Sequence, residues 1–206
     1  MFDNFINELQ HRLSLPLPGK EIQDRMAPSS RLNLSGLWSP FRPKKSAVLI
    51  LVFPVNGIPN TVFIERASYD GKHSGEISLP GGKTEKTDND IVGTALRESE
   101  EEIGIKSEDV RILGNLTPLY VPVSNFCIQP VVGAMGYMPE FVPDPAEAKD
   151  IIVISIDDLL NPVNKQSEEL KIITFKITAP YYNAHGHHIW GATAMIMSEF
   201  LEVIKR

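Results

Sequence analysis

The chain has 206 residues, of which 42% are hydrophobic and 22% are charged, and its formal net charge is −6. A chain of this length fills one hydrophobic core and is short for two, and the composition is that of an ordinary soluble globular protein. The acidic balance argues against a general nucleic-acid binder, and no apolar run approaches the roughly 20 residues that cross a bilayer, so we expect neither nucleic acid nor a membrane as a partner.

The single cysteine, Cys127, excludes an internal disulfide and fits a reducing compartment. The first residues lack a basic region followed by an apolar stretch, so the sequence predicts no signal peptide. The last three residues, 204–206, carry no peroxisomal address. Together these features predict a cytoplasmic location.

Residues 2–13 are predicted to form a short amphipathic helix, because hydrophobic side chains recur at helical spacing: Phe2, Phe5, Ile6, Leu9 and Leu13. We expect this helix to pack on the domain or on a second subunit, since its polar face lacks the basic residues of a membrane-surface helix. Residues 14–45 are rich in Pro, Ser and Arg and predict an irregular arm. Residues 1–45 are therefore assigned to an N-terminal helix and arm that pack on a single domain, residues 46–206.

Residues 46–54 form a continuous apolar run, which suits a buried strand. A second strand-like run, residues 61–66, follows across the turn-rich residues 56–60, so the two runs predict a hairpin. Further strand-like runs cover residues 110–121 and 126–137.

The last part of the chain mixes both kinds of element. Residues 139–149 are rich in Pro and acidic residues and predict a mobile loop. Residues 151–156 and 170–177 predict strands, residues 156–160 a short helical turn, and residues 192–204 a closing amphipathic helix. Because strands and helices do not alternate regularly, the pattern predicts an α/β (α+β) fold, a helix–sheet–helix sandwich with a mixed β-sheet.

The most informative segment is residues 81–105. On a helix, Glu98, Glu101 and Glu102 stand at i, i+3 and i+4, so their side chains share one face. An adjoining face is apolar and suited to packing on a sheet, through Ile91, Val92, Ala95, Leu96 and Ile103. Three carboxylates on one side of a helix repel each other unless cations lie among them, and hard divalent ions such as Mg²⁺ or Mn²⁺ prefer oxygen ligands.

A solvated acidic helix face is the alternative, and for an arbitrary run of glutamates it is the better one. The neighbouring residues favour the metal. The pair Gly81-Gly82 comes shortly before the helix, Arg97 adjoins Glu98 and can hold a carboxylate, and Gly104 is a suitable C-terminal stop.

The start of this helix is also marked. Asp88 and Asp90 lie where negative charge favours a helix N-terminus, and Thr87 or Asp88 is expected to cap it.

The segment resembles the Nudix box, G-x5-E-x7-R-E-U-x-E-E-x-G-U with U a bulky aliphatic. The matching residues are Gly82, Arg97, Glu98, Glu101, Glu102, Gly104 and Ile105. One extra residue separates Gly82 from Arg97, so Asp88 is the nearest counterpart of the early glutamate, and Ser99 replaces an aliphatic residue. The resemblance implies a Nudix-type sandwich and hydrolysis of a nucleoside diphosphate linked to another group.

Residues 62–82 resemble the extra motif of coenzyme A pyrophosphatases, L-L-T-x-R-S-x3-R-x3-G-x3-F-P-G-G. The matching residues are Arg66, Gly75, Pro80, Gly81 and Gly82, while Gly71 stands in place of the second arginine, next to Lys72. Residues 118–124 and 189–194 also fit that subfamily. This resemblance implies cleavage of coenzyme A to 3′,5′-ADP and 4′-phosphopantetheine, and it implies a homodimer.

We assign roles accordingly. Mg²⁺ or Mn²⁺ is expected on Glu98, Glu101 and Glu102, with the Gly82 backbone close to the metal and Gly81 close to the substrate. Other expected roles are substrate phosphate binding by Arg66 and Lys72 and orientation of a carboxylate by Arg97.

The general base stays open between a helix glutamate, Glu98 or Glu101, and an acid of the 139–150 loop, Glu147 or Asp150.

Other polar and aromatic residues are assigned structural roles. The residues His185, His187 and His188 have no fixed common face and no nearby acidic partner in the sequence, which disfavours a transition-metal site. Ser124 lacks the His-Asp pattern of a nucleophile. Aromatic residues expected in the core are Tyr120, Phe126 and Trp190, although Tyr120 could border the pocket.

Two rival functions remain. The first is the same chemistry on ADP-ribose, a dinucleotide such as NADH, or an oxidised nucleotide. The second is a non-catalytic module that senses a nucleotide; the intact Glu98, Glu101 and Glu102 argue against it, because a sensor does not need all three.

Overall fold

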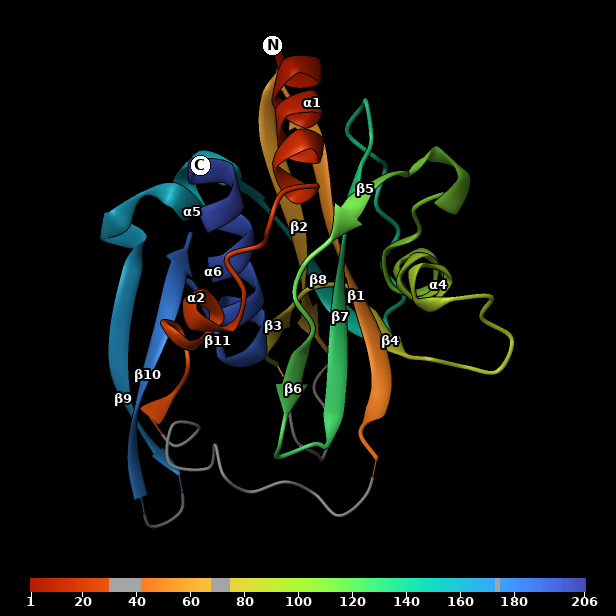
Figure 1. Ribbon diagram of the computed structural model, residues 1–206. Helices are drawn as coiled ribbons and strands as arrows, with labels where there is room; N and C mark the ends of the chain where they lie inside the picture. The colour runs from red at the N-terminus through yellow and green to blue at the C-terminus, as the bar shows by residue number, and fades with distance from the viewer. Residues whose placement is uncertain (30–41, 68–74, 173–174) are drawn as a thin grey trace.

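The computed structural model describes residues 1–29, 42–67, 75–172 and 175–206 (Figure 1). In chain order, the first half contains α1 (Phe2–Leu13), α2 (Lys20–Asp24), β1 (Lys44–Val55), β2 (Ile58–Arg66), β3 (Ile77–Ser78), β4 (Gly81–Lys83) and α4 (Ile91–Ile103). The second half contains β5 (Arg111–Asn115), β6 (Leu119–Val121), β7 (Phe126–Ala134), β8 (Ala148–Ser155), α5 (Ile156–Leu160), β9 (Lys165–Ile172), β10 (Phe175–Ala184), β11 (His187–Trp190) and α6 (Gly191–Lys205), with short 3₁₀ turns at Ser107–Asp109 and Pro162–Asn164.

The main sheet has eight strands, with the path β3-β2-β1-β7-β5 and with β4, β6 and β8 paired to β1, β7 and β2. Strand β1 pairs in parallel with β7, from Lys44 opposite Phe126 to Val52 opposite Ala134, and antiparallel with β2 and β4. The sheet is therefore mixed. Helix α4 lies on one side of it and α6 on the other, and a small sheet, β11-β10-β9, lies beyond α6 (Figure 1). The predicted sandwich with a mixed sheet is confirmed.

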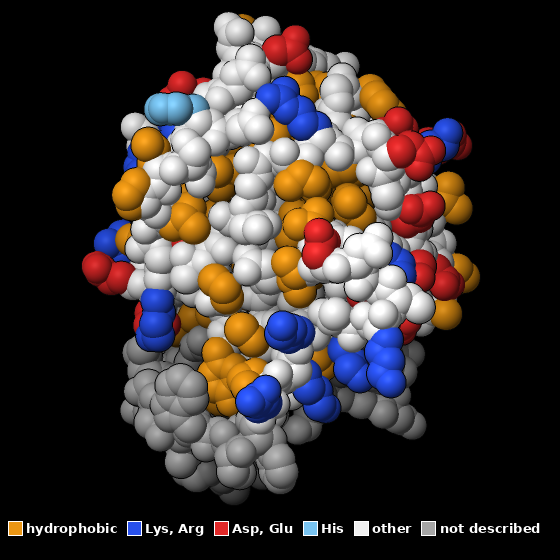
Figure 2. Space-filling model, turned by 45° about the vertical axis from the view of Figure 1, so that its right-hand side comes forward, with side chains coloured by type: hydrophobic (Ala, Val, Ile, Leu, Met, Phe, Trp, Pro, Cys, Tyr) orange, Lys and Arg blue, Asp and Glu red, His pale blue; other side chains and the backbone are white. Residues whose placement is uncertain are grey.

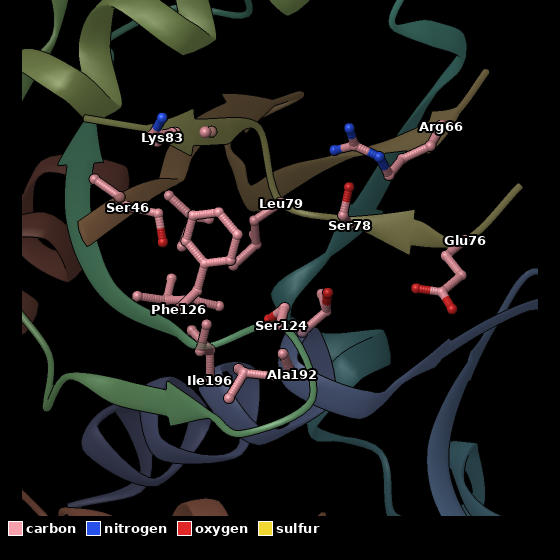
Figure 3. Close-up of a pocket in the computed structure, with 17 residues that line it drawn as sticks. Ser46, Arg66, Glu76, Ser78, Leu79, Lys83, Ser124, Phe126, Ala192 and Ile196 are labelled. Atoms are coloured by element: carbon pink, nitrogen blue, oxygen red, sulfur yellow. The ribbon is translucent and has the colours of Figure 1, made fainter. Parts of the chain in front are cut away.

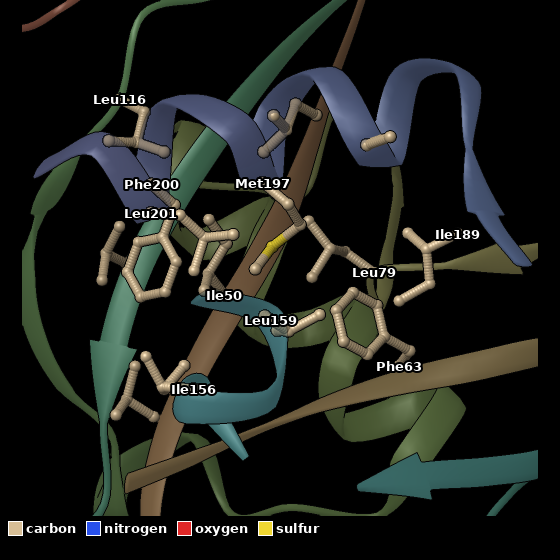
Figure 4. Close-up of a cluster of buried hydrophobic side chains, with 14 of the residues drawn as sticks. Ile50, Phe63, Leu79, Leu116, Ile156, Leu159, Ile189, Met197, Phe200 and Leu201 are labelled. Carbon is tan, nitrogen blue, oxygen red and sulfur yellow. The ribbon is translucent and has the colours of Figure 1, made fainter. Parts of the chain in front are cut away.

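The apolar run predicted as a buried strand supplies both layers of the core. Successive side chains of a strand point to opposite faces, so Leu49 and Leu51 pack on the α4 side while Ile50 and Val52 pack on the α6 side. The α6 layer is the larger, and Figure 4 shows its helix residues against those of the sheet and α5: Met197, Phe200 and Leu201 against Ile50, Phe63, Ile156 and Leu159.

The N-terminal helix joins the α6 layer, because Ile6, Leu9 and Leu13 are buried in the same cluster. The following residues are less irregular than expected, since α2 forms within them and packs on α6. The buried carboxylate of Glu199 on α6 holds this region. It accepts hydrogen bonds from the Gly19 backbone nitrogen (3.0 Å), the Gln23 side chain (2.8 Å), and the backbone nitrogen and hydroxyl of Thr117 (3.2 and 2.6 Å). A charge buried in this way is tolerable because four donors surround it.

Two predicted strands are each two strands. The run 110–121 breaks into β5 and β6 around Pro118, which cannot donate a backbone hydrogen bond. The predicted strand 170–177 spans the end of β9 and the start of β10, which are antiparallel neighbours; residues 173–174 between them lie outside the described part. Strand β9 was missed because it reads KQSEELKI and its described side chains are mostly exposed, so it lacks an apolar alternation.

The remaining predicted elements are confirmed, namely the helix at 2–13, the hairpin of β1 and β2, the strand at 126–137, the strand and turn at 151–160, and the closing helix. No helix in the described ranges has the length and apolar character that crossing a membrane requires.

Candidate active site

Helix α4 begins two to three residues later than the expected caps, Thr87 or Asp88. Asp90 is the N-cap, and its carboxylate accepts a hydrogen bond from the Gly93 backbone nitrogen (2.7 Å). The prediction of Thr87 or Asp88 as the cap is wrong, because the Asp88 carboxylate is committed to Arg97. The helix ends as predicted at Gly104, which has a φ of +71° in the left-handed region that favours glycine.

The three helix glutamates occupy different environments. Glu102 is buried, with 1% of its surface exposed, and Glu98 is half-buried, whereas the Glu101 side chain is 56% exposed. Ser99, where the motif has an aliphatic residue, is also buried, and its hydroxyl donates to the Ala95 carbonyl oxygen (2.7 Å). The hydroxyl is therefore accommodated without an unpaired polar group.

Glu102 points from α4 to the glycine pair on β4. Its carboxylate accepts a hydrogen bond from the Gly81 backbone nitrogen (2.7 Å) and lies 3.9 Å from the Arg66 guanidinium. The pKa of Glu102 is raised to about 7, mainly by burial; the nearby Glu147 and Glu98 contribute to the rise, while Gly81 and Arg66 oppose it. Near neutral pH this carboxyl group therefore carries negative charge only at a cost.

The glycine pair is required by close packing. Gly81 has a φ of +146°, and a Cβ atom there would lie 2.3 Å from the Ala47 carbonyl oxygen of β1. A Cβ atom on Gly82 would lie 2.1 Å from a carboxylate oxygen of Glu98. The absence of both side chains therefore lets β4 pass between β1 and the glutamates of α4.

The third carboxylate of the cluster comes from the loop before β8. Glu98, Glu102 and Glu147 each offer a carboxylate oxygen within 4.8 Å of the others, and no other described group of three or more His, Cys, Asp or Glu side chains comes as close. Burial is also the main cause of a raised pKa at Glu98, and the charges of Glu101 and Glu147 add to it. Arg97 and Arg66 offset the negative charge of these three carboxylates only in part, and converging carboxylate oxygens fit a hard divalent cation.

The loop that carries Glu147 is fixed to α4. The Val142 backbone nitrogen donates to the Ile103 carbonyl oxygen (3.0 Å), and the Asp144 backbone nitrogen donates to the Glu102 carbonyl oxygen (3.1 Å). The backbone oxygen of Glu147 also accepts from Ala67 (2.9 Å) at the end of β2. These bonds explain how a segment predicted as a mobile loop delivers a side chain to a defined place.

Arg97 connects the acidic residues around the helix. Its guanidinium donates to Asp88 (2.8 and 3.2 Å), Glu98 (2.9 Å) and Glu101 (3.0 Å), and to the Lys83 carbonyl oxygen (3.2 Å). Hydrogen bonding from Arg97 holds the pKa of Asp88 well below its usual range. Glu101 thus points to Arg97, and the structure gathers Glu98 and Glu102 with Glu147 rather than with Glu101.

A cavity of about 370 Å³ adjoins the carboxylates, and Figure 3 shows the side chains around it. It lies between the sheet and the N-terminal end of α6, and Arg66, Gly81 and Gly82 belong both to its wall and to the surroundings of the glutamates. The wall also includes Ser46, Val48, Leu79, Lys83, Val121, Ser124, Phe126, Ile128, Ala192 and Ile196. Most of this wall is apolar, so the cavity suits an organic group attached to an anion at Arg66.

The aromatic residues and histidines that the sequence analysis assigned to structural roles have the following surroundings. Phe126, expected in the core, is half-buried and lines the cavity. The Tyr120 hydroxyl donates to Asn125 (3.1 Å). His185 and His188 each lie beside one carboxylate, of Asp158 and of Glu168, at 3.3 and 3.4 Å.

Two candidates cannot be placed. Lys72, expected at a substrate phosphate, and the neighbouring His73 lie outside the described residues. The wall residues Ser46, Lys83 and Phe126 were missed as site residues, because strand register brings them together and no local sequence motif marks them.

Comparison with known proteins relates this chain to Nudix proteins. The family model of the NUDIX domain matches residues 43–173. The human "Mitochondrial coenzyme A diphosphatase NUDT8" is 32% identical over 79% of this chain and 70% of its own length. "Nudix hydrolase 15, mitochondrial" of Arabidopsis thaliana is 34% identical over 76% of this chain, which spans only 57% of that protein.

A bacterial protein and a solved structure complete the comparison. The "Uncharacterized Nudix hydrolase NudL" of Pectobacterium atrosepticum is 30% identical over 82% of this chain and 88% of its own length. The crystal structure of a MutT/nudix family protein from Enterococcus faecalis superposes with a TM-score of 0.51 over 90% of this chain and 73% of that one, at 15% identity, which is a likeness of fold. The names of the relatives include mitochondrial proteins, so the cytoplasmic location stays a prediction, as does the homodimer.

Proposed function

Because this chain belongs to the NUDIX domain family and is a Nudix hydrolase, we propose that it cleaves the diphosphate bond of coenzyme A or an acyl derivative. The products would be 3′,5′-ADP and 4′-phosphopantetheine or its acyl form. The observation that carries the proposal is the meeting of Glu98, Glu102 and Glu147 beside Arg66, at the edge of a cavity of about 370 Å³. The name of the human relative supports coenzyme A as the substrate.

Glu98, Glu102 and Glu147 are the residues that would hold Mg²⁺ or Mn²⁺. When bound there, a divalent cation neutralises charge on the diphosphate and lowers the pKa of a coordinated water. The chain supplies the positions of the ligands. Arg97 fixes the carboxylate of Glu98 through a 2.9 Å hydrogen bond, and the Gly81 backbone nitrogen fixes that of Glu102 at 2.7 Å.

Arg66 is the residue that we assign to the substrate diphosphate. Its guanidinium lies at the border between the carboxylates and the cavity, and its side chain is partly exposed. It stands 3.9 Å from Glu102, which is longer than a hydrogen bond, and its side chain donates no hydrogen bond to another described residue, so we assign its donors to a phosphate oxygen. A diphosphate held there places one half of the substrate in the cavity.

Glu147 is our candidate for the general base. Its carboxylate reaches the cluster, and no donor among the described residues is recorded for it, whereas Glu98 and Glu102 both accept hydrogen bonds. Glu101 is a weaker candidate than it was from the sequence, because its carboxylate turns to Arg97 and is 56% exposed. A base needs an oxygen that neither a donor nor the cation occupies, and we assign this role to the second carboxylate oxygen of Glu147, the one not counted as a metal ligand.

The test is product analysis by mass spectrometry after hydrolysis of coenzyme A in ¹⁸O-labelled water with Mg²⁺. We expect 3′,5′-ADP and 4′-phosphopantetheine, with the label on one of them, which identifies the phosphorus attacked. Parallel kinetics with ADP-ribose and NADH test the rival substrates. If either exceeds coenzyme A by more than about tenfold in kcat/KM, the assignment to coenzyme A fails. If no substrate of the panel is hydrolysed, the sensing module replaces the enzyme.

A further inference from the structure

The cavity has a basic end that the hydrolysis of the diphosphate does not use. In Figure 3, Ser46, Lys83 and Phe126 gather at one end of the cavity, while Arg66 and Glu76 lie at the other. The carboxylates that receive the cation adjoin Arg66 and the glycine pair. The end with Lys83 therefore faces a part of the substrate other than the group held by Arg66.

Strand register brings a second lysine to this end. Lys83 of β4 lies directly opposite Ser46 of β1, and Lys44 of β1 lies beside Phe126 of β7. Lys44 and Ser46 are two residues apart on one strand, so their side chains lie on the same face. Lys44 is thus the diagonal cross-strand neighbour of Lys83, and such residues are about 7–8 Å apart. Two lysine side chains are long enough to contact one anion across that separation.

Both lysines keep their charge available. The Lys44 ammonium lies 5.6 Å from the centroid of the Phe126 ring, a cation–π contact that itself uses none of the hydrogen-bond donors of the ammonium group. Among the described residues, no carboxylate forms an ion pair with Lys44 or Lys83, although Lys149 and Lys176 do have such partners. Figure 2 shows several Lys and Arg side chains beside hydrophobic ones in the lower part of the view, on a chain whose net charge is −6.

We propose that Lys44 and Lys83 bind a phosphomonoester on the substrate, namely the 3′-phosphate of the adenosine half of coenzyme A, and that the Phe126 ring contacts the nucleoside. The inference rests on the proposed function and deepens it. Outside its diphosphate, coenzyme A carries one further charged group, the 3′-phosphate, so a second cationic site on the same cavity matches that group alone. The adenosine half then lies in the cavity, and the pantetheine half points away from it.

The site is a selectivity device. ADP-ribose, NADH and 3′-dephospho-coenzyme A contain the diphosphate but no 3′-phosphate, so they leave Lys44 and Lys83 unpaired. Because both lysines are exposed, we expect kcat/KM for coenzyme A to exceed that for a substrate without the 3′-phosphate by about ten- to a hundredfold. This preference should weaken as the salt concentration rises, as it does for partly solvated charge pairs.

The test compares the full chain with the double variant Lys44→Gln, Lys83→Gln. Lys45→Gln is the matched control, because Lys45 is the neighbouring exposed lysine of β1 and its side chain lies on the opposite face. The ratio of kcat/KM for coenzyme A to that for 3′-dephospho-coenzyme A is measured for each. We expect a ratio of about ten or more in the natural sequence and in the control, and a ratio near one in the double variant. An equal ratio in all three overturns the proposal.

A binding measurement separates this proposal from the proposed reaction. Titration calorimetry with adenosine 3′,5′-bisphosphate and with 5′-AMP needs no turnover. Tighter binding of the bisphosphate by about tenfold or more, lost in the double variant and kept in Lys45→Gln, supports the site whatever the enzyme hydrolyses. Equal binding of the two nucleotides overturns it, even if coenzyme A proves to be the substrate. Failure of the proposed function shows instead as absent hydrolysis of coenzyme A.

Discussion

Asp88 and Arg97 form a two-point ion pair across the start of α4, with Asp88 oxygens accepting from the Arg97 Nε at 2.8 Å and from its Nη2 at 3.2 Å. The Asp88 side chain is only 2% exposed, and it also accepts from the Thr94 hydroxyl (2.8 Å) and the Glu85 backbone nitrogen (2.8 Å). The guanidinium is thereby fixed in the orientation in which it reaches Glu98. Asp88, the nearest counterpart in the sequence of the box's early glutamate, therefore holds Arg97 in place.

The first prediction concerns this ion pair. Asp88→Asn removes the charge that fixes Arg97, so Glu98 loses its orientation. We expect kcat to fall by about ten- to a hundredfold, the usual effect of removing a group that orients a metal ligand. The apparent affinity for Mg²⁺ should fall with it, measured by metal titration of the activity. Glu85→Gln is the control, because its side chain is exposed and only its backbone contacts Asp88. Equal losses in the two variants would refute the orienting role of Asp88.

The second prediction concerns pH and Glu102. Its pKa is raised from 4.5 to about 7, so the folded state prefers the protonated form. The corresponding stability is fully present below the unfolded pKa and is lost as pH rises through the folded value. We therefore expect the metal-free protein to lose on the order of 3 kcal/mol at most between pH 4.5 and pH 7, seen as a falling Tm, because each pKa unit corresponds to about 1.4 kcal/mol.

Added Mg²⁺ should reverse that loss at pH 7.5, and Glu102→Gln should remove both the pH-dependent fall and the response to Mg²⁺. Glu100→Gln is the control on the same helix, because its side chain is exposed and, within the described part of the chain, hydrogen-bonds only to Ser107. A flat Tm between pH 4.5 and pH 7 in the metal-free natural sequence would contradict the strained charge at Glu102.

The third prediction separates two glutamates that the sequence treated alike. Glu147→Gln should lower kcat by about a hundredfold or more at saturating Mg²⁺, as expected for loss of a base or of a metal ligand. Glu101→Gln should cost less than about tenfold, since its carboxylate is largely solvated and bonds to Arg97. Steady-state kinetics over a range of Mg²⁺ concentrations measure both. A larger loss of kcat in Glu101→Gln than in Glu147→Gln would instead support the role of Glu101 as a metal ligand or base that its helical spacing predicted.

Local patterns predicted most of the fold. The apolar run of β1, the helical spacing of α1, α4 and α6, and the stop at Gly104 each depend on neighbours in the sequence. The split of residues 170–177 between β9 and β10 did not follow, because an exposed strand that pairs at the edge of a small sheet carries no apolar period. A hydrophobic pattern arises only where one face of an element is buried, so an exposed strand such as β9 cannot be predicted from it.

The site was predictable as far as its residues lie on one helix. The spacing of Glu98 and Glu102 placed two carboxylates together, and the glycine pair was expected beside them. The choice of Glu147 over Glu101 depends on backbone bonds between a loop and the end of α4, made by Val142 and Asp144. Those bonds join segments about forty residues apart and involve only backbone atoms, so no side-chain pattern announces them.

The last prediction tests the close approach of β4 to α4. In Gly82→Ala the added Cβ would lie 2.1 Å from a Glu98 oxygen, so the flexible carboxylate must move away from Glu102 and Glu147. We expect kcat/KM to fall by about a hundredfold while Tm changes little, because the half-buried Glu98 carboxylate lies at the end of a flexible side chain and can shift without disturbing the apolar core. Gly93→Ala is the matched control. Of the described residues outside its own helix backbone, its Cβ would meet only Asp90, at an ordinary 3.5 Å, and an alanine inside α4 should stabilise the helix by up to about 1 kcal/mol, raising Tm with activity retained. If Gly82→Ala keeps full activity, the position of the Glu98 carboxylate does not matter for turnover, and the cation site must be built from other residues.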